Sequence, residues 1–250
     1  MIEFNNISKT FNPGTPQQIR ALSDINLSIA KEDFVIIVGS NGSGKSTLLN
    51  AIAGTIIPDK GKLSIEGHDV THWKDYRRSK WVARIFQDPF MGTASELSII
   101  DNFRLAAIRT NKKGLTIGIN SKFKEKVKER IALLGLGLED KLEQSMGTLS
   151  GGQRQALTLI MAVMDDAKIL LLDEPSSALD PKTSEIIMEK ADQIIKEFKL
   201  TSILITHNLK DATNYGNRLI FMKEGIISMD IKDNDKAQMS LQDIQRLFHT

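Results

Sequence analysis

The segment Gly39-Ser-Asn-Gly-Ser-Gly-Lys-Ser-Thr47 constrains this chain more than any other. It matches the pattern of glycine, four variable residues, glycine, lysine, and serine or threonine, which binds nucleotide phosphates between a strand and a helix. Its glycines let successive backbone N–H groups point at an anion, and the following helix adds the positive end of its dipole. Lys45 places a cation on the β- and γ-phosphate oxygens, and Ser46 offers a hydroxyl to Mg²⁺. The predicted nucleotide ligands are Gly39, Ser40, Asn41, Gly42, Ser43, Gly44, Lys45, Ser46 and Thr47.

The patterns on either side of this segment predict an α/β fold. Residues 34–38 form an apolar β-branched run typical of a strand buried on both faces, and residues 46–54 have helical periodicity. Because short buried strands alternate with helices, we expect a mainly parallel sheet with its ligand site at the carboxyl ends of the strands. Further predicted elements are strands at 169–172 and 202–205, a β segment at 219–222 followed by a turn at 224–225, and helices at 153–164 and 182–199.

Two segments depart from this alternation. Residues 1–30 alternate apolar and polar positions around a Pro/Gly turn, which predicts an N-terminal antiparallel β layer. Residues 88–147 lack β-branched runs and carry apolar residues at helical intervals in 98–109 and 122–134, which predicts an inserted helical lobe. The basic cluster 122–130 alternates with acids, so we interpret it as a solvated helix face rather than a phosphate-binding patch.

We expect one domain over residues 1–250, without an appended regulatory domain. Ser240-Leu-Gln-Asp243 predicts a capping box that opens a short terminal helix. The expected parts are a core of residues 1–86 and 148–230, a helical lobe of residues 87–147, and a C-terminal tail of residues 231–250.

Two adjacent carboxylates follow the predicted strand 169–172. Neighbouring residues at a strand end point in different directions, so Asp173 and Glu174 can divide their roles. Asp173 is placed to hold Mg²⁺ through its water shell, and Glu174 to polarise an attacking water as general base. An isolated Asp-Glu pair is usually surface charge, but the preceding buried strand and the phosphate-binding loop favour the catalytic interpretation.

Composition excludes several classes of function. The net charge is +2 with basic and acidic residues interspersed, which gives no electrostatic basis for binding nucleic acid. There are no cysteines, so neither disulfides nor thiolate metal sites are available. The N-terminus does not resemble a signal peptide, and no window approaches the ~18 apolar residues of a spanning helix. We therefore expect an intracellular chain that reaches a membrane only through a partner.

The segment Leu149-Ser-Gly-Gly-Gln-Arg-Gln155 matches the signature motif of the ABC ATPase family, which the chain resembles up to about residue 230. The resemblance implies a P-loop NTPase core, ATP and Mg²⁺ as cofactors, and hydrolysis of ATP. It also implies an ATP-sandwiched dimer with a second copy of the chain. In that dimer Ser150, Gly151, Gly152 and Gln153 contact the γ-phosphate held by the P-loop of the other subunit.

The same resemblance assigns roles to four further residues. Gln87 corresponds to the Q-loop glutamine, which contacts Mg²⁺ and water and begins the helical lobe. Asp180 matches the D-loop that crosses to the other subunit, and His207 matches the switch histidine at the γ-phosphate. Phe11 lies where the family has an aromatic residue that stacks on adenine, although a core phenylalanine is an alternative. By themselves Gln87 and His207 would be interpreted as a surface glutamine and a capping or core histidine.

Three classes of function compete. The first is the energy subunit of a transporter, partnered by integral membrane permease subunits and located peripherally at the cytoplasmic face of the cell (inner) membrane. The second is a soluble ABC ATPase acting on ribosomes or DNA, whose members carry paired cassettes, coiled coils or zinc cysteines that this chain lacks. The third is a small-molecule kinase, against which the signature segment argues. The first is favoured.

Direction and cargo rest on looser similarity. The segments 90–94 and 215–225 are similar to a bacterial subgroup that works with a periplasmic-type binding protein and a branched-chain-amino-acid-like permease, often described as aromatic amino acid importers. Many members have His where this chain has Pro175. Import of an amino-acid-like solute, with an extracytoplasmic solute-binding protein, is therefore the hypothesis. The alternative is an exporter or lipoprotein-release system, which the N-terminal spacing also resembles.

The segment from Phe90 to Phe103 is the predicted docking surface for the permease, because it follows Gln87 directly. Candidate contacts are Phe90, Met91, Leu97 and Ile100. The alternative is that these side chains pack the helical lobe, and it is favoured for Ile100 and Phe103.

Overall fold

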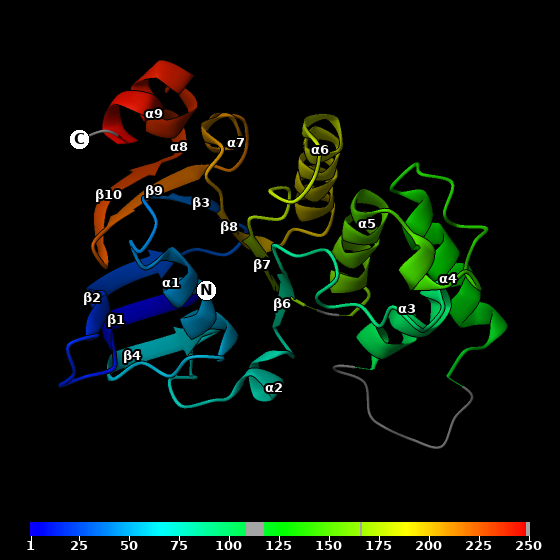
Figure 1. The fold of residues 1–250 in the computed structure, drawn as a ribbon, viewed down its shortest axis with the longest axis horizontal. Helices are drawn as coiled ribbons and strands as arrows, with labels where there is room; N and C mark the ends of the chain where they lie inside the picture. The colour runs from blue at the N-terminus through cyan, green and yellow to red at the C-terminus, as the bar shows by residue number, and fades with distance from the viewer. Residues whose placement is uncertain (109–117, 166, 249–250) are drawn as a thin grey trace.

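The computed structural model describes residues 1–108, 118–165 and 167–248. Arg109, the last residue of the helix expected at 98–109, lies outside the described residues, as does the very end of the expected tail. Two β-sheets lie side by side and extend from the left edge of the molecule to its middle in Figure 1, and a group of helices occupies the right side.

The larger sheet carries the predicted strands and has the order β10-β9-β3-β8-β7-β6. β3, β6, β7, β8 and β9 run parallel, while β10 returns antiparallel to β9 after the turn at residues 224–225. The strands are β3 (Phe34–Val38), β6 (Val82–Ile85), β7 (Ile169–Asp173), β8 (Thr201–Ile205), β9 (Arg218–Lys223) and β10 (Ile226–Lys232). The predicted α/β class with a mainly parallel sheet is confirmed.

The smaller sheet is wholly antiparallel, in the order β2-β1-β4-β5, and confirms the N-terminal layer. Its strands are β1 (Ile2–Phe11), β2 (Ile19–Ile29), β4 (Lys60–Ile65) and β5 (His68–Asp69). Sequence reasoning did not predict β4, β5, β6 or β10. β4 begins with three exposed residues and β10 is largely exposed, so neither shows the buried pattern that identifies a strand.

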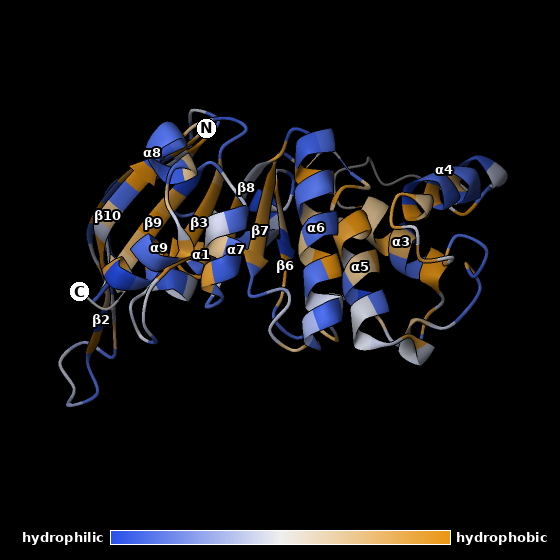
Figure 2. Cartoon of the chain, turned by 90° about the horizontal axis from the view of Figure 1, so that it is seen from above, coloured by the Kyte–Doolittle hydropathy of each residue, from blue (hydrophilic) through white to orange (hydrophobic). Residues whose placement is uncertain are grey.

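The central strand β3 separates two cores. All five of its residues are buried, and its side chains alternate between the two sides. Val35 and Ile37 join the core between the sheets, where Leu48 and Ile52 of helix α1 (Lys45–Ala53) also lie. Ile36 and its neighbours on the other side join the core beneath helices α5 and α6. Figure 2 shows the apolar strands at the centre and the polar outer faces of the helices. This packing fixes the loop between β3 and α1 over the sheet edge.

The helical lobe lies at the far end from the antiparallel sheet (Figure 1). Its helices are α3 (Ile99–Ala107) and α4 (Ser121–Ala132), which begin at the side-chain caps Ser98 and Asn120. Helix α5 (Gly151–Ala162) packs against both of them and against α6 (Pro181–Glu197). We keep the lobe boundary at 87–147 as a proposal, with α5 as the element that joins lobe and core.

Short helices complete the chain: α2 (Asp75–Arg78), the 3₁₀ helix η1 (Met146–Thr148), α7 (Leu209–Asn214), α8 (Asp233–Ala237) and α9 (Leu241–Phe248). The predicted capping box opens α9, because Asp243 N–H donates to Ser240 Oγ at 3.2 Å and Ser240 N–H donates to Asp243 Oδ2 at 3.0 Å. Over the described part of the chain, no helix combines the length and apolar character needed to cross a bilayer.

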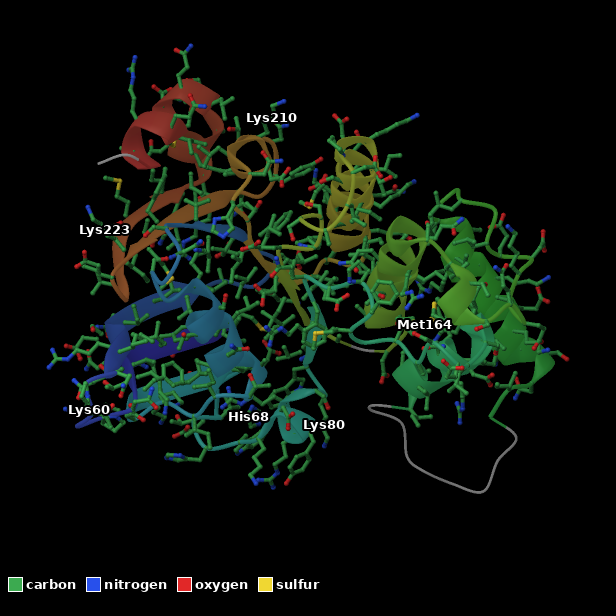
Figure 3. All side chains as sticks on the ribbon, in the orientation of Figure 1. Lys60, His68, Lys80, Met164, Lys210 and Lys223 are labelled. Atoms are coloured by element: carbon green, nitrogen blue, oxygen red, sulfur yellow. The ribbon has the colours of Figure 1, made fainter. Side chains whose placement is uncertain are left out.

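Four of the exposed lysines lie far apart from one another. Lys60, Lys210 and Lys223, labelled in Figure 3, project from separate places at the edge of the ribbon, and Lys80 lies beside α2. These four cations do not form one contiguous surface.

Candidate active site

The phosphate-binding loop adopts a conformation that requires glycine at two positions. Gly39 would place a Cβ 2.2 Å from the carbonyl oxygen of Met222, and Gly44 would place one 2.3 Å from that of Ala21. Gly44 is also the N-cap of α1, with φ of 100° in the left-handed region. The loop therefore packs directly on β9 and β2, with the start of α1 behind it.

Lys45 is turned into the loop. Its Nζ donates to the carbonyl oxygens of Gly39 at 2.8 Å and Ser40 at 2.9 Å. Burial lowers the pKa of the ammonium, and the nearby carboxylates of Glu174 and Asp173 oppose that shift. The loop thus holds its cation in place beneath the position predicted for phosphate.

A cavity of about 330 Å³ opens in front of the loop. Besides loop residues from Asn41 to Thr47, its lining includes Phe11, Glu174 and His207. The structure therefore brings together four sequence-predicted groups that lie up to about two hundred residues apart: the loop, the stacking candidate, the proposed base and the proposed switch histidine. Ala21 and Ile19 of β2 complete the apolar side beside Phe11, where an aromatic base could pack.

Glu174 has an unusual backbone conformation. Its φ is 48°, a left-handed value uncommon for a residue with a side chain. The backbone holds it there through the bond from Glu174 N–H to the Ile205 carbonyl at 3.0 Å and the bond from Ser177 Oγ to the Glu174 carbonyl at 3.0 Å. Strained positions of this kind concentrate at functional sites. The carboxylate faces His207, whose Nε2 lies 2.7 Å from Glu174 Oε1.

Asp173 is paired with a residue that sequence reasoning missed. Arg84 of β6 donates from Nη2 to Asp173 Oδ2 at 2.7 Å. The signal is visible only once β6 is known: a basic residue in the otherwise apolar strand Val82–Ile85 is partly buried and needs a carboxylate partner.

Gln87 lies in a second cavity of about 730 Å³ together with Asp173, Phe90 and Gly151. The three predicted Mg²⁺ ligands are thus divided, since Ser46 lines the first cavity and Asp173 and Gln87 line the second. Gln155 of α5, which sequence reasoning also missed, supports this segment by donating from Nε2 to the Phe86 carbonyl at 3.1 Å.

The predicted signature segment opens α5. Ser150 is its N-cap and forms a capping box with Gln153, through Gln153 N–H to Ser150 Oγ at 3.3 Å and Ser150 N–H to Gln153 Oε1 at 3.1 Å. Gly152 lies against α6, where a Cβ would come within 2.3 Å of Thr183 Cγ2. Among the described residues that line the phosphate-loop cavity, none comes from this segment.

Asp180 caps α6 by accepting from Thr183 N–H at 3.1 Å. Hydrogen bonds from Thr183 lower the pKa of this carboxyl, which is exposed. Like Ser150 of the signature segment, Asp180 is therefore presented at the surface and is not among the described residues that line the phosphate-loop cavity of its own chain.

The predicted docking segment divides between surface and core. Phe90, Met91 and Leu97 are 61%, 53% and 39% exposed. Ile100 and Phe103 are buried in the lobe, so Ile100 is removed from the candidate contacts. One face of the Phe90 ring covers the guanidinium of Arg154 at 4.2 Å, and Arg154 donates to Ser95 Oγ at 3.0 Å.

The donor set suits Mg²⁺. The Ser46 hydroxyl, the Asp173 carboxylate and the Gln87 amide are hard oxygen ligands, few enough to leave places for phosphate oxygens and water, as Mg²⁺ prefers. Within the described residues, no cluster of three His, Cys, Asp or Glu side chains could hold a metal alone. A bound nucleotide would therefore have to supply ligands.

Comparison with known proteins gives concordant results. The family model of ABC transporters matches residues 22–177. A tyrosine transport ATP-binding protein of Clostridioides difficile is 39% identical, over 99% of this chain and 98% of the relative. A phosphonates import ATP-binding protein of Lactococcus lactis is 33% identical, over 98% and 99%. The dimeric post-hydrolysis state of an ATP-binding cassette bound to ADP and Pi is 29% identical, covers 93% of this chain and 98% of its own, and has a TM-score of 0.78.

Proposed function

This chain belongs to the ABC transporter ATP-binding family and is an ATP-hydrolysing subunit of a transporter. From that premise we propose that it drives a bacterial solute importer. In this proposal two copies of the chain close head to tail around ATP. The observation that carries this proposal is the separation of two phosphate-binding helix starts. The start of α1 lines the phosphate-loop cavity. At the start of α5, Ser150 is exposed and Gly151, Gly152 and Gln153 are partly buried, and none of these four is among the described residues that line that cavity. A second copy would bring its α5 to this cavity.

Within each site, the residues have separate roles. The loop from Gly39 to Thr47 binds the phosphates, and Phe11 packs on the base. Glu174 accepts a proton from the attacking water. His207, whose Nε2 lies against Oε1 of Glu174, orients this carboxylate. Ser46, Asp173 and Gln87 would hold Mg²⁺, which would supply positive charge to the phosphate oxygens. Ser150, Gly151, Gly152, Gln153 and Asp180 act on the nucleotide held by the other copy.

Import is favoured over export because one relative that aligns over essentially its full length is named for phosphonate import. We further propose an amino-acid-like cargo, which the name of the relative for tyrosine transport supports. An extracytoplasmic solute-binding protein and a position on the cytoplasmic face of the cell membrane complete the proposed importer. Phe90 and Met91 supply the exposed apolar contact for a permease beside Gln87.

The proposal is tested by the dependence of hydrolysis on protein concentration. If each site needs two copies, the rate of phosphate release rises faster than linearly as the purified subunit is concentrated. Strictly linear activity down to nanomolar protein would identify a one-subunit enzyme and contradict the proposal.

A further inference from the structure

Arg84 joins three elements at the proposed metal site. From β6 its Nη2 donates to Asp173 Oδ2 at 2.7 Å, at the end of β7, and its Nη1 donates to Asn50 Oδ1 at 2.6 Å, on α1. The guanidinium also lies 4.9 Å from the centre of the Phe86 ring. The side chains of Arg84 and Asp173 are only 15% and 17% exposed, so solvent screens their attraction weakly.

The protein does not satisfy this guanidinium completely. Arg84 Nε is buried without a hydrogen-bond partner among the described residues. A buried donor without a partner costs free energy, so the protein holds this guanidinium less firmly than a fully bonded one. The Arg84 guanidinium already occupies Oδ2 of Asp173, the carboxylate that the proposed function assigns to Mg²⁺.

Arg84 takes up Oδ2 of Asp173. A guanidinium and Mg²⁺ beside one carboxylate repel each other, even where water lies between the ion and the carboxylate. Resting on the proposed function, which makes Asp173 a metal ligand, we propose that Arg84 is a built-in counter-ion. It holds the Asp173 carboxylate in the nucleotide-free chain and yields it when Mg²⁺ binds with nucleotide. Arg84 is thus a positioning residue that sets the magnesium concentration the site requires.

This competition predicts the sign of a measurable change. Removing the charge with Arg84→Gln should tighten Mg²⁺ binding to the ADP-loaded subunit, because the ion no longer displaces or faces a guanidinium. One unit charge so near the ion corresponds to at least about tenfold in the dissociation constant, even at the high effective dielectric near a surface. If Arg84 instead only orients Asp173 for the metal, the same substitution weakens binding.

Mg²⁺ is titrated calorimetrically into the full-length subunit saturated with ADP, and the melting temperature is measured without nucleotide or metal. Arg84→Gln should bind Mg²⁺ about tenfold more tightly and melt lower when nucleotide-free, since Asp173 has lost its partner. Arg84→Lys keeps the charge and should bind Mg²⁺ within about twofold of the parent. Arg77→Gln, the same change on the exposed surface of α2, should alter neither quantity.

Asn50→Ala gives a second test that leaves the guanidinium in place. Freed from its anchor on α1, Arg84 yields Asp173 more easily, and Mg²⁺ should bind about threefold more tightly. If Arg84→Gln does not fold, Mg²⁺ binding by Asn50→Ala tests the counter-ion role of Arg84 by itself. Unchanged or weaker Mg²⁺ binding in the folded variants would overturn the counter-ion role. A parent that binds ADP but shows no Mg²⁺ binding would instead contradict the proposed metal site itself.

Discussion

The Nε2 atom of His207 lies 2.7 Å from Oε1 of Glu174, across the ends of the neighbouring parallel strands β8 and β7. Glu174 reaches this position with a left-handed backbone, at φ of 48°. The sheet thus presents a carboxylate and an imidazole side by side in the phosphate-loop cavity, at the edge where parallel sheets collect their ligands. The contact gives His207 a direct means of orienting the proposed general base.

Replacing Glu174 with Gln should lower the turnover number by about 10²–10⁴-fold and leave ATP binding intact, because only the proton acceptor is lost. The ATP-loaded variant should accumulate as a dimer in gel filtration. Glu32→Gln is the matched control, since Glu32 is also a left-handed glutamate but lies exposed outside the cavity. Near-parental hydrolysis by Glu174→Gln would remove Glu174 from the catalytic role.

Lys45→Ala and Ser46→Ala should impair nucleotide binding by different routes. The lysine variant loses a buried cation and should bind ATP weakly at every magnesium concentration. The serine variant loses an oxygen ligand, so raising Mg²⁺ should restore much of its affinity. Both are measured by titrating a fluorescent ATP analogue at low and high Mg²⁺. Parental affinity in both variants would contradict phosphate binding by this loop.

Substituting Phe90 and Met91 together with Ser should reduce the amount of subunit bound to membranes in cells while basal ATPase activity stays within about twofold of the parent. Both side chains are more than half exposed, so little core packing is lost. Ile226→Ser, at an apolar position on β10 that is also exposed, is the control. Membrane-bound protein at the parental level would place the docking surface elsewhere. Loss of basal activity would assign both residues to the fold.

Arg78→Met should destabilise the chain by about 3 kcal/mol in urea unfolding, because it leaves several buried carbonyl groups without donors. The Arg78 guanidinium is fully buried and donates to the carbonyls of Ala51 and Ile52 at the end of α1 and to those of Val70, Thr71 and Trp73. Burial lowers its pKa to about 10, so it remains charged at neutral pH.

Arg77→Met, at the exposed neighbouring position, should change the unfolding free energy by less than about 0.5 kcal/mol. Equal effects of the two substitutions would mean that the buried hydrogen bonds of Arg78 contribute nothing specific.

Local sequence patterns were sufficient to predict the strand and the helix on either side of the phosphate loop. The run from Phe34 to Val38 is buried at every residue, and two of the glycines after it, Gly39 and Gly44, occupy positions where a side chain would collide with β9 or β2. The order of motifs also predicted that Phe11, Glu174 and His207 belong with that loop, and one cavity contains them. Roles on the nucleotide remain predictions for all of these residues.

Long-range pairings were not predictable from local patterns. β6 is only four residues long and carries Arg84, which interrupts its apolar run, so neither the strand nor the Arg84–Asp173 pair could be identified from periodicity. The stack of Arg154 on Phe90 joins residues that are far apart in sequence, and nothing in either local segment indicates the other. For Ile100 local reasoning was sufficient, since the favoured interpretation assigned this residue to the lobe core, where it is buried.

The central claim is that the phosphate loop of one chain works with the signature segment of another. It is tested most directly by mixing two inactive variants, Lys45→Ala and Ser150→Arg, and measuring phosphate release. In a mixed dimer, the intact loop of the second variant meets the intact Ser150 of the first, so one site is restored. Equal mixing should return about a quarter of the parental activity, because half of the dimers are mixed and each has one of two sites. Activity no greater than the sum of the separate variants would contradict the head-to-tail dimer.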